Sequence, residues 1–208
     1  MESQDRQSHW QSVYIQKGES EVSWFQENPA PSLAMIEQTG AAPGSAIIDI
    51  GGGASRLVDR LVERDFRNVT VLDLSRAALE VAKARLGDGA AQVQWLVADV
   101  TIWEPQDTYD IWHDRAAFHF LTDQADRAAY VARLGQAVRV GGHAIIATFA
   151  LDGPERCSGL PVVRYDAASL GKTLGDRFEL VNTRSDAHAT PWGSEQSFQF
   201  SLFRRVGS

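Results

Sequence analysis

Short apolar runs alternate with helical patterns along most of the chain from about residue 45. Ala46–Ile50 is such a run, and Leu57, Val58 and Leu61 then recur at helical spacing. Where strands and helices alternate in this way, the strands lie parallel and right-handed crossovers place helices against the sheet. The pattern therefore predicts an α/β fold. Seven strands are expected, over Ala46–Ile50, Val69–Leu72, Val93–Val97, Tyr109–Trp112, Ala144–Phe149, Phe178–Thr183 and Ser197–Phe203.

The end of the chain departs from this alternation. Only a polar turn separates Phe178–Thr183 from Ser197–Phe203, so these strands are expected to pair antiparallel at one edge of the sheet. A long helix is predicted over residues 123–138, ended by Gly141-Gly142, and a short one over Ala167–Leu174. The predicted fold class is a three-layer αβα sandwich around a seven-stranded, mostly parallel, doubly wound sheet with an antiparallel last strand.

The chain has 208 residues, enough for one compact domain and too short for two ordinary ones. Residues 1–42 are polar and aromatic in alternation, and we expect them to form an N-terminal arm or lid. Residues 43–208 are expected to form the main domain. Within it, residues 152–165 are rich in Gly and Pro and are predicted to form a substrate loop.

Composition excludes several classes of protein. The formal net charge of -7 argues against binding to nucleic-acid phosphates. No apolar run approaches the roughly 18 residues of a membrane helix, and the first residues carry no apolar signal-peptide core. Cys157 is the one cysteine, so an internal disulfide and Cys-based metal spacings are absent. We therefore expect a cytoplasmic protein with no metal, no membrane partner and no nucleic-acid partner.

A glycine-rich loop follows the first expected strand. In Asp49–Ser55 (DIGGGAS) the glycines allow close approach of the backbone to a ligand. Any tight turn between a strand and a helix can also require glycine, so the loop alone is a weak signal. Asp73 and Asp99 end the second and third strands, where their carboxylates can accept hydrogen bonds from a ribose and from an adenine amino group. Each acid can equally serve only as a helix cap.

The spacing of the loop selects among nucleotide sites. A dinucleotide fingerprint G-x-G-x-x-G requires glycine at position 56, which is Arg56, and no lysine completes a P-loop. An oxidoreductase with a nicotinamide cofactor is therefore disfavoured. The pattern favours a nucleoside without phosphates.

Five segments in order resemble the successive motifs of class I S-adenosylmethionine-dependent methyltransferases. They are Asp49–Ser55, Val69–Ser75, Val93–Val100, Tyr109–His113 and Gly141–Phe149, and the resemblance spans about residues 45 to 150. The family has a seven-stranded sheet with a reversed last strand, which agrees with the expected strands. Ser55 is a departure, since many members carry a third glycine there. The resemblance implies a Rossmann-like methyltransferase domain over residues 43–208, with residues 1–42 as its arm.

The same resemblance implies a cofactor site. S-adenosylmethionine would bind there, and S-adenosylhomocysteine would leave as the product. Asp49, Gly51 and Gly53 would surround its methionine part, Asp73 its ribose and Asp99 its adenine. The full set of expected cofactor-binding residues is Asp49, Gly51, Gly52, Gly53, Asp73, Leu74, Asp99 and Val100.

The fourth expected strand ends in His113, Asp114 and Arg115, which are the candidate catalytic residues. Carboxyl ends of strands face the ligand in such sheets, so the three are expected beside the transferable methyl group. His113 can act as a base near neutral pH, and Arg115 can hold an anionic acceptor. The alternative is that Asp114 and Arg115 form a structural ion pair and His113 only packs on the cofactor.

The candidate substrate and lid residues are aromatic or lie in the Gly- and Pro-rich loop. They are Trp10, Tyr14, Trp24, Cys157 and Tyr165. The Asp-Arg pair and this loop resemble thiopurine and related thiol methyltransferases, whereas the N-terminal aromatic residues resemble protein-lysine methyltransferases of the same fold. Cys157, beside Arg156, is either a somewhat activated thiol or a small residue filling a loop.

We therefore predict an enzyme that transfers a methyl group from S-adenosylmethionine to a small-molecule acceptor, such as a thiol or another soft nucleophile. A protein-lysine methyltransferase is the alternative within the enzyme class. The alternative from another class is a non-catalytic module that binds S-adenosylmethionine and acts through a partner. Methyl transfer is an in-line displacement that depends mainly on positioning, so no catalytic triad is required.

Overall fold

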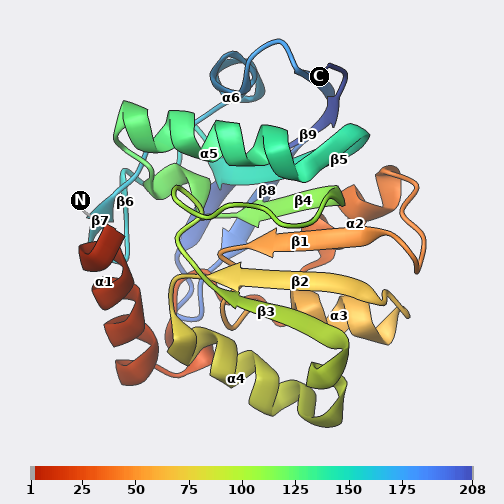
Figure 1. Cartoon of the computed structure of the whole chain (residues 1–208). Helices are drawn as coiled ribbons and strands as arrows, with labels where there is room; N and C mark the ends of the chain where they lie inside the picture. Colours follow the sequence, from red (N-terminus) through yellow and green to blue (C-terminus); the bar gives the residue numbers. More distant parts are fainter. Residues whose placement is uncertain (1–2, 208) are drawn as a thin grey trace.

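The computed structural model describes residues 3–207 and contains one seven-stranded sheet in the order β3-β2-β1-β4-β5-β9-β8 (Figure 1). Strands β1 to β5 pair parallel with one another, whereas β9 pairs antiparallel with both β5 and β8. The predicted mixed sheet is thus confirmed, with β9 as its reversed strand. The strands are β1 (Ala46–Ile50), β2 (Asn68–Asp73), β3 (Val93–Val97), β4 (Tyr109–Arg115), β5 (Val138–Phe149), β8 (Phe178–Ala189) and β9 (Glu195–Arg205).

Helices cover both faces of the sheet and enclose two hydrophobic cores. Ile47 of β1 packs in the core that contains α2, α3 and α4, whereas Ile48 packs in the core that contains α5 and α6. Successive side chains of a strand point to opposite faces, so one short apolar strand supplies both cores. The helices are α1 (Ser3–Gln16), α2 (Ala30–Gln38), α3 (Leu57–Glu63), α4 (Arg76–Leu86), α5 (Gln124–Ala137) and α6 (Ala167–Leu174), with 3-10 turns η1 (Glu19–Glu21), η2 (Gly87–Gln92) and η3 (Phe118–Phe120).

The register between β1 and β4 decides which side chains share a face at the carboxyl ends of these strands. Asp49 is opposite His113, and Ile50 is opposite Asp114. Because the side-chain period of a strand is two, His113 lies on the same face as Asp49 and Asp114 lies on the other face. Ser75 then caps α4 by accepting from Ala78 N over 3.1 Å, immediately after β2 ends.

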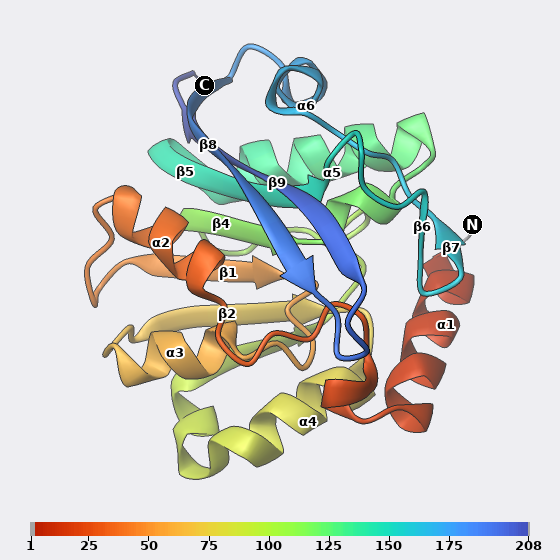
Figure 2. The same ribbon diagram turned by 180° about the vertical axis from the view of Figure 1, so that it is seen from behind.

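The N-terminal segment lies across the carboxyl ends of the central strands. Figure 1 shows α1 beside the arrowheads of β1 and β2, and Figure 2 shows it next to the short hairpin β6–β7. The following helix, α2, packs into the sheet, where Leu33, Met35 and Ile36 are buried in the first core. The first part of the chain thus contributes both a cover over the strand ends and a core helix.

Two local expectations differ from the structure. The long helix ends at Ala137 and β5 begins at once at Val138, so Gly141-Gly142 lie inside a strand and do not end a helix. They belong to a bulge, because the β4–β5 register passes from Tyr109–Val138 directly to Ile111–His143. The expected loop over residues 152–165 contains the hairpin of β6 (Arg156–Cys157) and β7 (Leu160–Pro161).

Candidate active site

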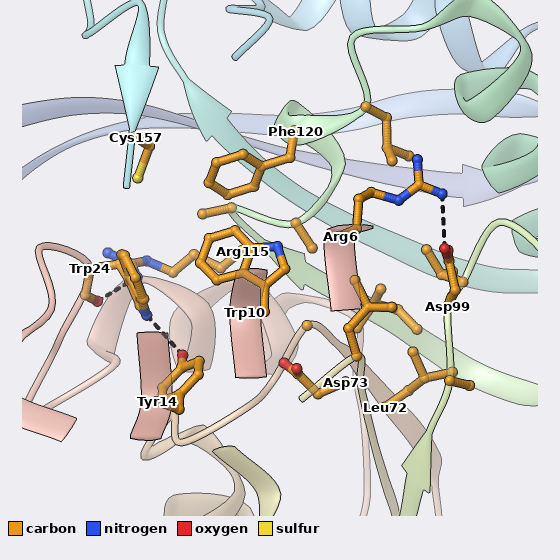
Figure 3. Close-up of a pocket in the computed structure, with 18 residues that line it drawn as sticks. Arg6, Trp10, Tyr14, Trp24, Leu72, Asp73, Asp99, Arg115, Phe120 and Cys157 are labelled. Atoms are coloured by element: carbon orange, nitrogen blue, oxygen red, sulfur yellow. Dashed lines mark hydrogen bonds and ion pairs between the residues drawn. The ribbon is translucent and has the colours of Figure 1, made fainter. Parts of the chain in front are cut away.

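A cleft opens at the carboxyl ends of β1 to β4, beneath the N-terminal segment. It holds about 790 Å³ of space, part of it open to solvent. A second cavity of about 570 Å³ adjoins it and shares Gly51, Tyr14, Trp24 and Arg115 as walls. Figure 3 shows that aromatic side chains of the N-terminal segment face the ends of the strands across the cleft.

The glycine loop is fixed by close packing around β1. Gly51 and Gly53 have φ values of +64° and +46°, in the left-handed region that favours glycine. A Cβ atom on Gly52 would lie 2.6 Å from Asp49 Oδ2, and one on Gly51 would lie 2.7 Å from the Cβ of Ala117. Glycine at these positions therefore lets the loop approach β4 and the Asp49 carboxylate.

Asp73 ends β2 as a buried carboxylate that accepts hydrogen bonds from backbone groups. Its Oδ1 accepts from Ser75 N over 2.7 Å. Burial, with a smaller effect from the charge of Asp49, raises the pKa of Asp73 to about 7 against the opposing hydrogen bonds of Ser75 and Gly53. A ligand that donates two hydroxyl groups would stabilise the ionised form, and a ribose has this chemistry.

Asp99 also lines the cleft, but both of its oxygens already have donors. Oδ2 accepts from Arg6 Nη2 over 2.8 Å and from Ser3 Oγ over 2.6 Å, while Thr101 donates to Oδ1. Burial alone would raise the pKa of Asp99, but the hydrogen bonds from Ser3, Arg6 and Thr101 outweigh it and lower the pKa. The expected adenine partner is thus tied to α1 in this state. Leu74 and Val100, which follow the two acids, line the same cleft.

His113 lies in the second cavity within a chain of hydrogen bonds. Its Nδ1 is 2.7 Å from Asp49 Oδ1, and its Nε2 is 2.9 Å from Ser32 Oγ. All three side chains are buried. An ionised Asp49 can only accept, so Nδ1 would then carry a proton, and in a neutral imidazole Nε2 would accept from the Ser32 hydroxyl. His113 is therefore oriented by its neighbours and holds the glycine loop through Asp49.

The structure places Asp114 outside the cleft. Its carboxylate accepts from Ala117 N and Phe118 N and from Tyr130 Oη, the last over 2.7 Å. Tyr130 in turn accepts from Trp112 Nε1 over 2.7 Å. Burial raises the pKa of Asp114 to about 6. We therefore correct its expected catalytic role to a structural one: Asp114 shapes the turn after β4. The alternative ion pair with Arg115 is not formed.

Arg115 ends β4 on the cleft side and lines both cavities. Its Nη1 donates to the carbonyl oxygen of Trp24 over 2.9 Å, and its guanidinium lies 4.6 Å from the centre of the Phe198 ring. Ala116, the next residue, has a φ of +68° and also lines the cleft. The backbone therefore turns sharply after β4, and Arg115 lies at the wall of the cleft.

The three expected lid residues line the cleft together. Trp24 Nε1 donates to Tyr14 Oη over 3.1 Å, and the Trp10 ring lies 5.6 Å from that of Trp24 and 4.9 Å from that of Phe120. Burial raises the pKa of Tyr14 well above its usual range. These edge-to-face contacts join the N-terminal segment to the turn after β4.

The two candidate residues of the loop, Cys157 and Tyr165, lie in different surroundings. Cys157 lines the cleft, where burial raises the pKa of its thiol to about 11, so the thiol is protonated at neutral pH. The interpretation of an activated Cys157 is thus wrong, since burial outweighs the attraction of nearby cations. Tyr165 packs 5.5 Å from Phe118 in the second core and does not line the cleft.

Several residues of the site were not predicted from the sequence. Arg6 lines the cleft and pairs with Asp99 and with Asp126, the latter over 2.5 Å, yet nothing in its polar helix signals this position. The sequence around Ser32 likewise gives no signal of its place in the site. Phe120 could have been found, because it follows the fourth strand within an apolar aromatic stretch.

Neither a membrane helix nor a metal cluster was found in the part of the chain that the structure describes. No helix within residues 3–207 combines the length and apolar character needed to cross a bilayer. Over the same residues, no three His, Cys, Asp or Glu side chains gather as a metal site would require. The expectation of metal-free chemistry stays a prediction.

Comparison with known proteins agrees with this geometry. Residues 47–142, which contain the glycine loop, Asp73, Asp99 and the end of β4, match the methyltransferase domain family. The sheet order and the reversed β9 are those expected of the class I fold. Over these residues the chain is similar to class I methyltransferases. Their cofactor is S-adenosylmethionine, which the site must therefore be tested against.

Relatives of this methyltransferase act on different kinds of acceptor, as their names state. A malonyl-[acyl-carrier protein] O-methyltransferase of Anoxybacillus flavithermus is 33% identical over 44% of this chain and 35% of its own length. The eEF1A lysine and N-terminal methyltransferase of Mus musculus is 24% identical over 64% of this chain and 20% of its own length. The chain thus spans about a third or less of these relatives.

A solved structure shares the whole fold. The 1,6-didemethyltoxoflavin-N1-methyltransferase of Burkholderia thailandensis, with its substrate and S-adenosylhomocysteine bound, superposes with a TM-score of 0.70. The match is 17% identical and covers 100% of this chain and 92% of that one. It shows that the N-terminal segment belongs to the shared fold.

The residues present fit S-adenosylmethionine. The glycine loop forms a cradle that side chains would fill, and Asp73 is a buried carboxylate that accepts from the backbone. Asp73 lines the cleft, and Asp49 lines the second cavity, which adjoins it. These two acceptors suit the hydroxyl groups of a ribose and the amino group of an amino-acid chain respectively.

Proposed function

We propose that this methyltransferase moves the methyl group of S-adenosylmethionine to a small-molecule acceptor. The observation that supports this most directly is the enclosed cleft, in which the glycine loop and Asp73 face Trp10, Trp24 and Phe120. One side has the chemistry of a nucleoside site and the other has the chemistry of a site for an apolar acceptor. The cofactor would be held by Asp49, Gly51, Gly52, Gly53, Asp73, Leu74, Asp99 and Val100.

S-adenosylmethionine supplies a methyl carbon that its positively charged sulfur activates. The chain would position the two reactants. Asp73 and the glycine loop would hold the cofactor, and the aromatic side chains of the cleft would confine the methyl acceptor. α1 and the β6–β7 hairpin lie near the strand ends (Figure 2), and such a cover would limit the access of water to the reactants. His113 would have to lose its bond from Ser32 to accept a proton at Nε2, so we assign it to positioning.

The closed walls favour a small acceptor over a protein side chain. Trp10, Tyr14 and Trp24 contact one another above the cleft, and Arg6 ties their helix to Asp99. A lysine of a protein substrate would have to pass through this cover. The similarity to the eEF1A lysine methyltransferase supports the lysine alternative. A non-catalytic binding module is the third possibility.

A transfer assay separates these functions. The purified chain is incubated with methyl-tritiated S-adenosylmethionine and either the small-molecule or the protein fraction of a cell extract. We expect label in small organic products, and less of it with Asp73→Asn at limiting cofactor, whereas the exposed control Asp88→Asn labels like the wild type. Label in protein would favour the lysine alternative. Binding of the cofactor without any transfer would favour the non-catalytic module.

A further inference from the structure

The guanidinium of Arg115 carries donors that the protein does not use. Its Nη1 donates to the Trp24 carbonyl, but Nε and Nη2 are buried without a hydrogen-bond partner among the described residues 3–207. A buried polar group without a partner costs free energy, and a charged group costs more. These two donors of one guanidinium can therefore bind an acceptor group of a ligand.

The charge on Arg115 also has no direct ion-pair partner within residues 3–207, although Asp186 and Asp49 act on it from a distance. Burial lowers the pKa of Arg115 to about 10, with a smaller opposing effect from Asp186, so the guanidinium stays charged at neutral pH. The Phe198 ring behind it supplies only a cation–π contact. An anion brought to this wall would meet a positive charge in a partly dehydrated site.

The surroundings define the rest of the ligand. Trp10, Trp24 and Phe120 line the cleft with Arg115, as Figure 3 shows. Planar apolar walls bind a planar apolar body, while the fork of a guanidinium matches the two oxygens of a carboxylate. Nε and Nη2 are the pair of donors that such a bidentate contact uses.

We propose that Arg115 binds the anionic group of the methyl acceptor, and that the acceptor is a small aromatic or similarly planar carboxylic acid. This inference rests on the proposed function and names its substrate class. Arg115 lies between the two cavities, so an acid anchored there is confined beside the cofactor cleft.

The cofactor carries a carboxylate of its own, which is a second source of the same chemistry. Two adenosine compounds separate the sources, because S-adenosylhomocysteine has the amino-acid carboxylate and 5'-methylthioadenosine lacks it. If Arg115 held the cofactor, Arg115→Gln would weaken binding of the first compound and leave the second unchanged. The proposal instead requires both affinities to stay within about threefold of the wild type.

The test is calorimetric titration with benzoate, salicylate and 3-phenylpropionate, each paired with its neutral amide, with and without saturating S-adenosylhomocysteine. The wild type should bind at least one acid at least about tenfold tighter than its amide. Arg115→Gln should abolish that preference, Arg115→Lys should keep part of it, and Arg184→Gln, at an exposed position on β8, should keep all of it.

Equal affinity for acids and amides, or no bound acid, would overturn the proposal. So would selective loss of S-adenosylhomocysteine binding in Arg115→Gln. Failure of the wild type to bind S-adenosylhomocysteine would count against the proposed function instead, and the titrations without it would still report the acid preference of Arg115. Circular dichroism checks that each variant is folded. If Arg115→Gln does not fold, Arg115→Lys still tests the proposal, because it should keep part of the preference for acids.

Discussion

Arg6 of α1 donates from Nη2 to Asp99 Oδ2 at the end of β3 over 2.8 Å. Both side chains are buried, and Arg6 Nη1 reaches Asp126 of α5 as well. One residue of the N-terminal helix thus links two elements on either side of the cleft. Since the expected adenine partner is the same Asp99, we propose that the closure of α1 and the occupation of the cleft are coupled through this carboxylate.

Removal of this link should loosen the cover. In Arg6→Gln the buried Asp99 loses its charged donor, at a cost of about 1–3 kcal/mol. We expect faster hydrogen exchange over Ser3–Gln16 and faster release of S-adenosylhomocysteine in stopped-flow measurements. Arg60→Gln, which breaks a surface pair with Glu63, is the matched control. Wild-type exchange and release in Arg6→Gln would contradict the coupling.

Asp73→Asn should weaken S-adenosylhomocysteine binding by about 1–3 kcal/mol, or roughly fivefold to 150-fold, because a charged acceptor for the ribose is lost. The amide keeps the volume of the carboxylate, so the variant should fold. Isothermal titration gives the affinity, with Asp88→Asn as the exposed control. An unchanged dissociation constant would remove Asp73 from the cofactor site.

The raised pKa of Asp73, about 7, predicts a pH dependence of binding. The ionised carboxylate accepts hydroxyl groups, so affinity is full above pH 7 and falls as the pH drops through that value. The decrease should approach about tenfold per pH unit on the acid side. Titrations of S-adenosylhomocysteine across this range in wild type and Asp73→Asn check this. The slope should disappear in the variant, and a slope that persists there belongs to another group.

The corrected role of Asp114 predicts a loss of stability without a loss of cofactor affinity. Tyr130→Phe removes the hydroxyl that joins Trp112 to Asp114 and leaves buried polar groups unpaired. Urea denaturation should show a loss of about 1–3 kcal/mol. The affinity for S-adenosylhomocysteine should stay within about twofold of the wild type. A large loss of affinity at unchanged stability would return Asp114 to the site.

Cys157 should resist alkylation. It is 5% exposed, and burial raises the pKa of its thiol to about 11. Because the chain has one cysteine, mass spectrometry reads its reaction with iodoacetamide without ambiguity. We expect slow labelling in the native protein, slower labelling with S-adenosylhomocysteine bound, and faster labelling in Arg6→Gln. Rapid labelling of the native wild type would contradict the enclosed cleft.

The fold could be predicted because local patterns decide most of it. The limits of Ala46–Ile50, Val93–Val97 and Ala167–Leu174 agree with the structure residue by residue, since apolar runs and caps are encoded locally. Gly141-Gly142 was wrongly predicted to end a helix. Glycine ends helices and also occurs in bulges, and only the pairing of β4 with β5 distinguishes these two roles.

The site was predictable in part for the same reason. Alternation along β4 already places His113 and Arg115 on one face and Asp114 on the other, so the three could not share one cavity. Arg6 and Ser32 could not be found, because their partners lie far away in the sequence. Contacts of this kind depend on how helices dock, which no local pattern records.

Titration of the folded wild-type chain with S-adenosylmethionine, S-adenosylhomocysteine and NAD, side by side, tests the central claim most directly. The claim is that the cleft above the glycine loop binds a nucleoside without phosphates. We predict micromolar binding of the first two compounds, reduced in Asp73→Asn, and no binding of NAD. Absence of binding by both sulfur nucleosides, in protein shown to be folded, would contradict the account.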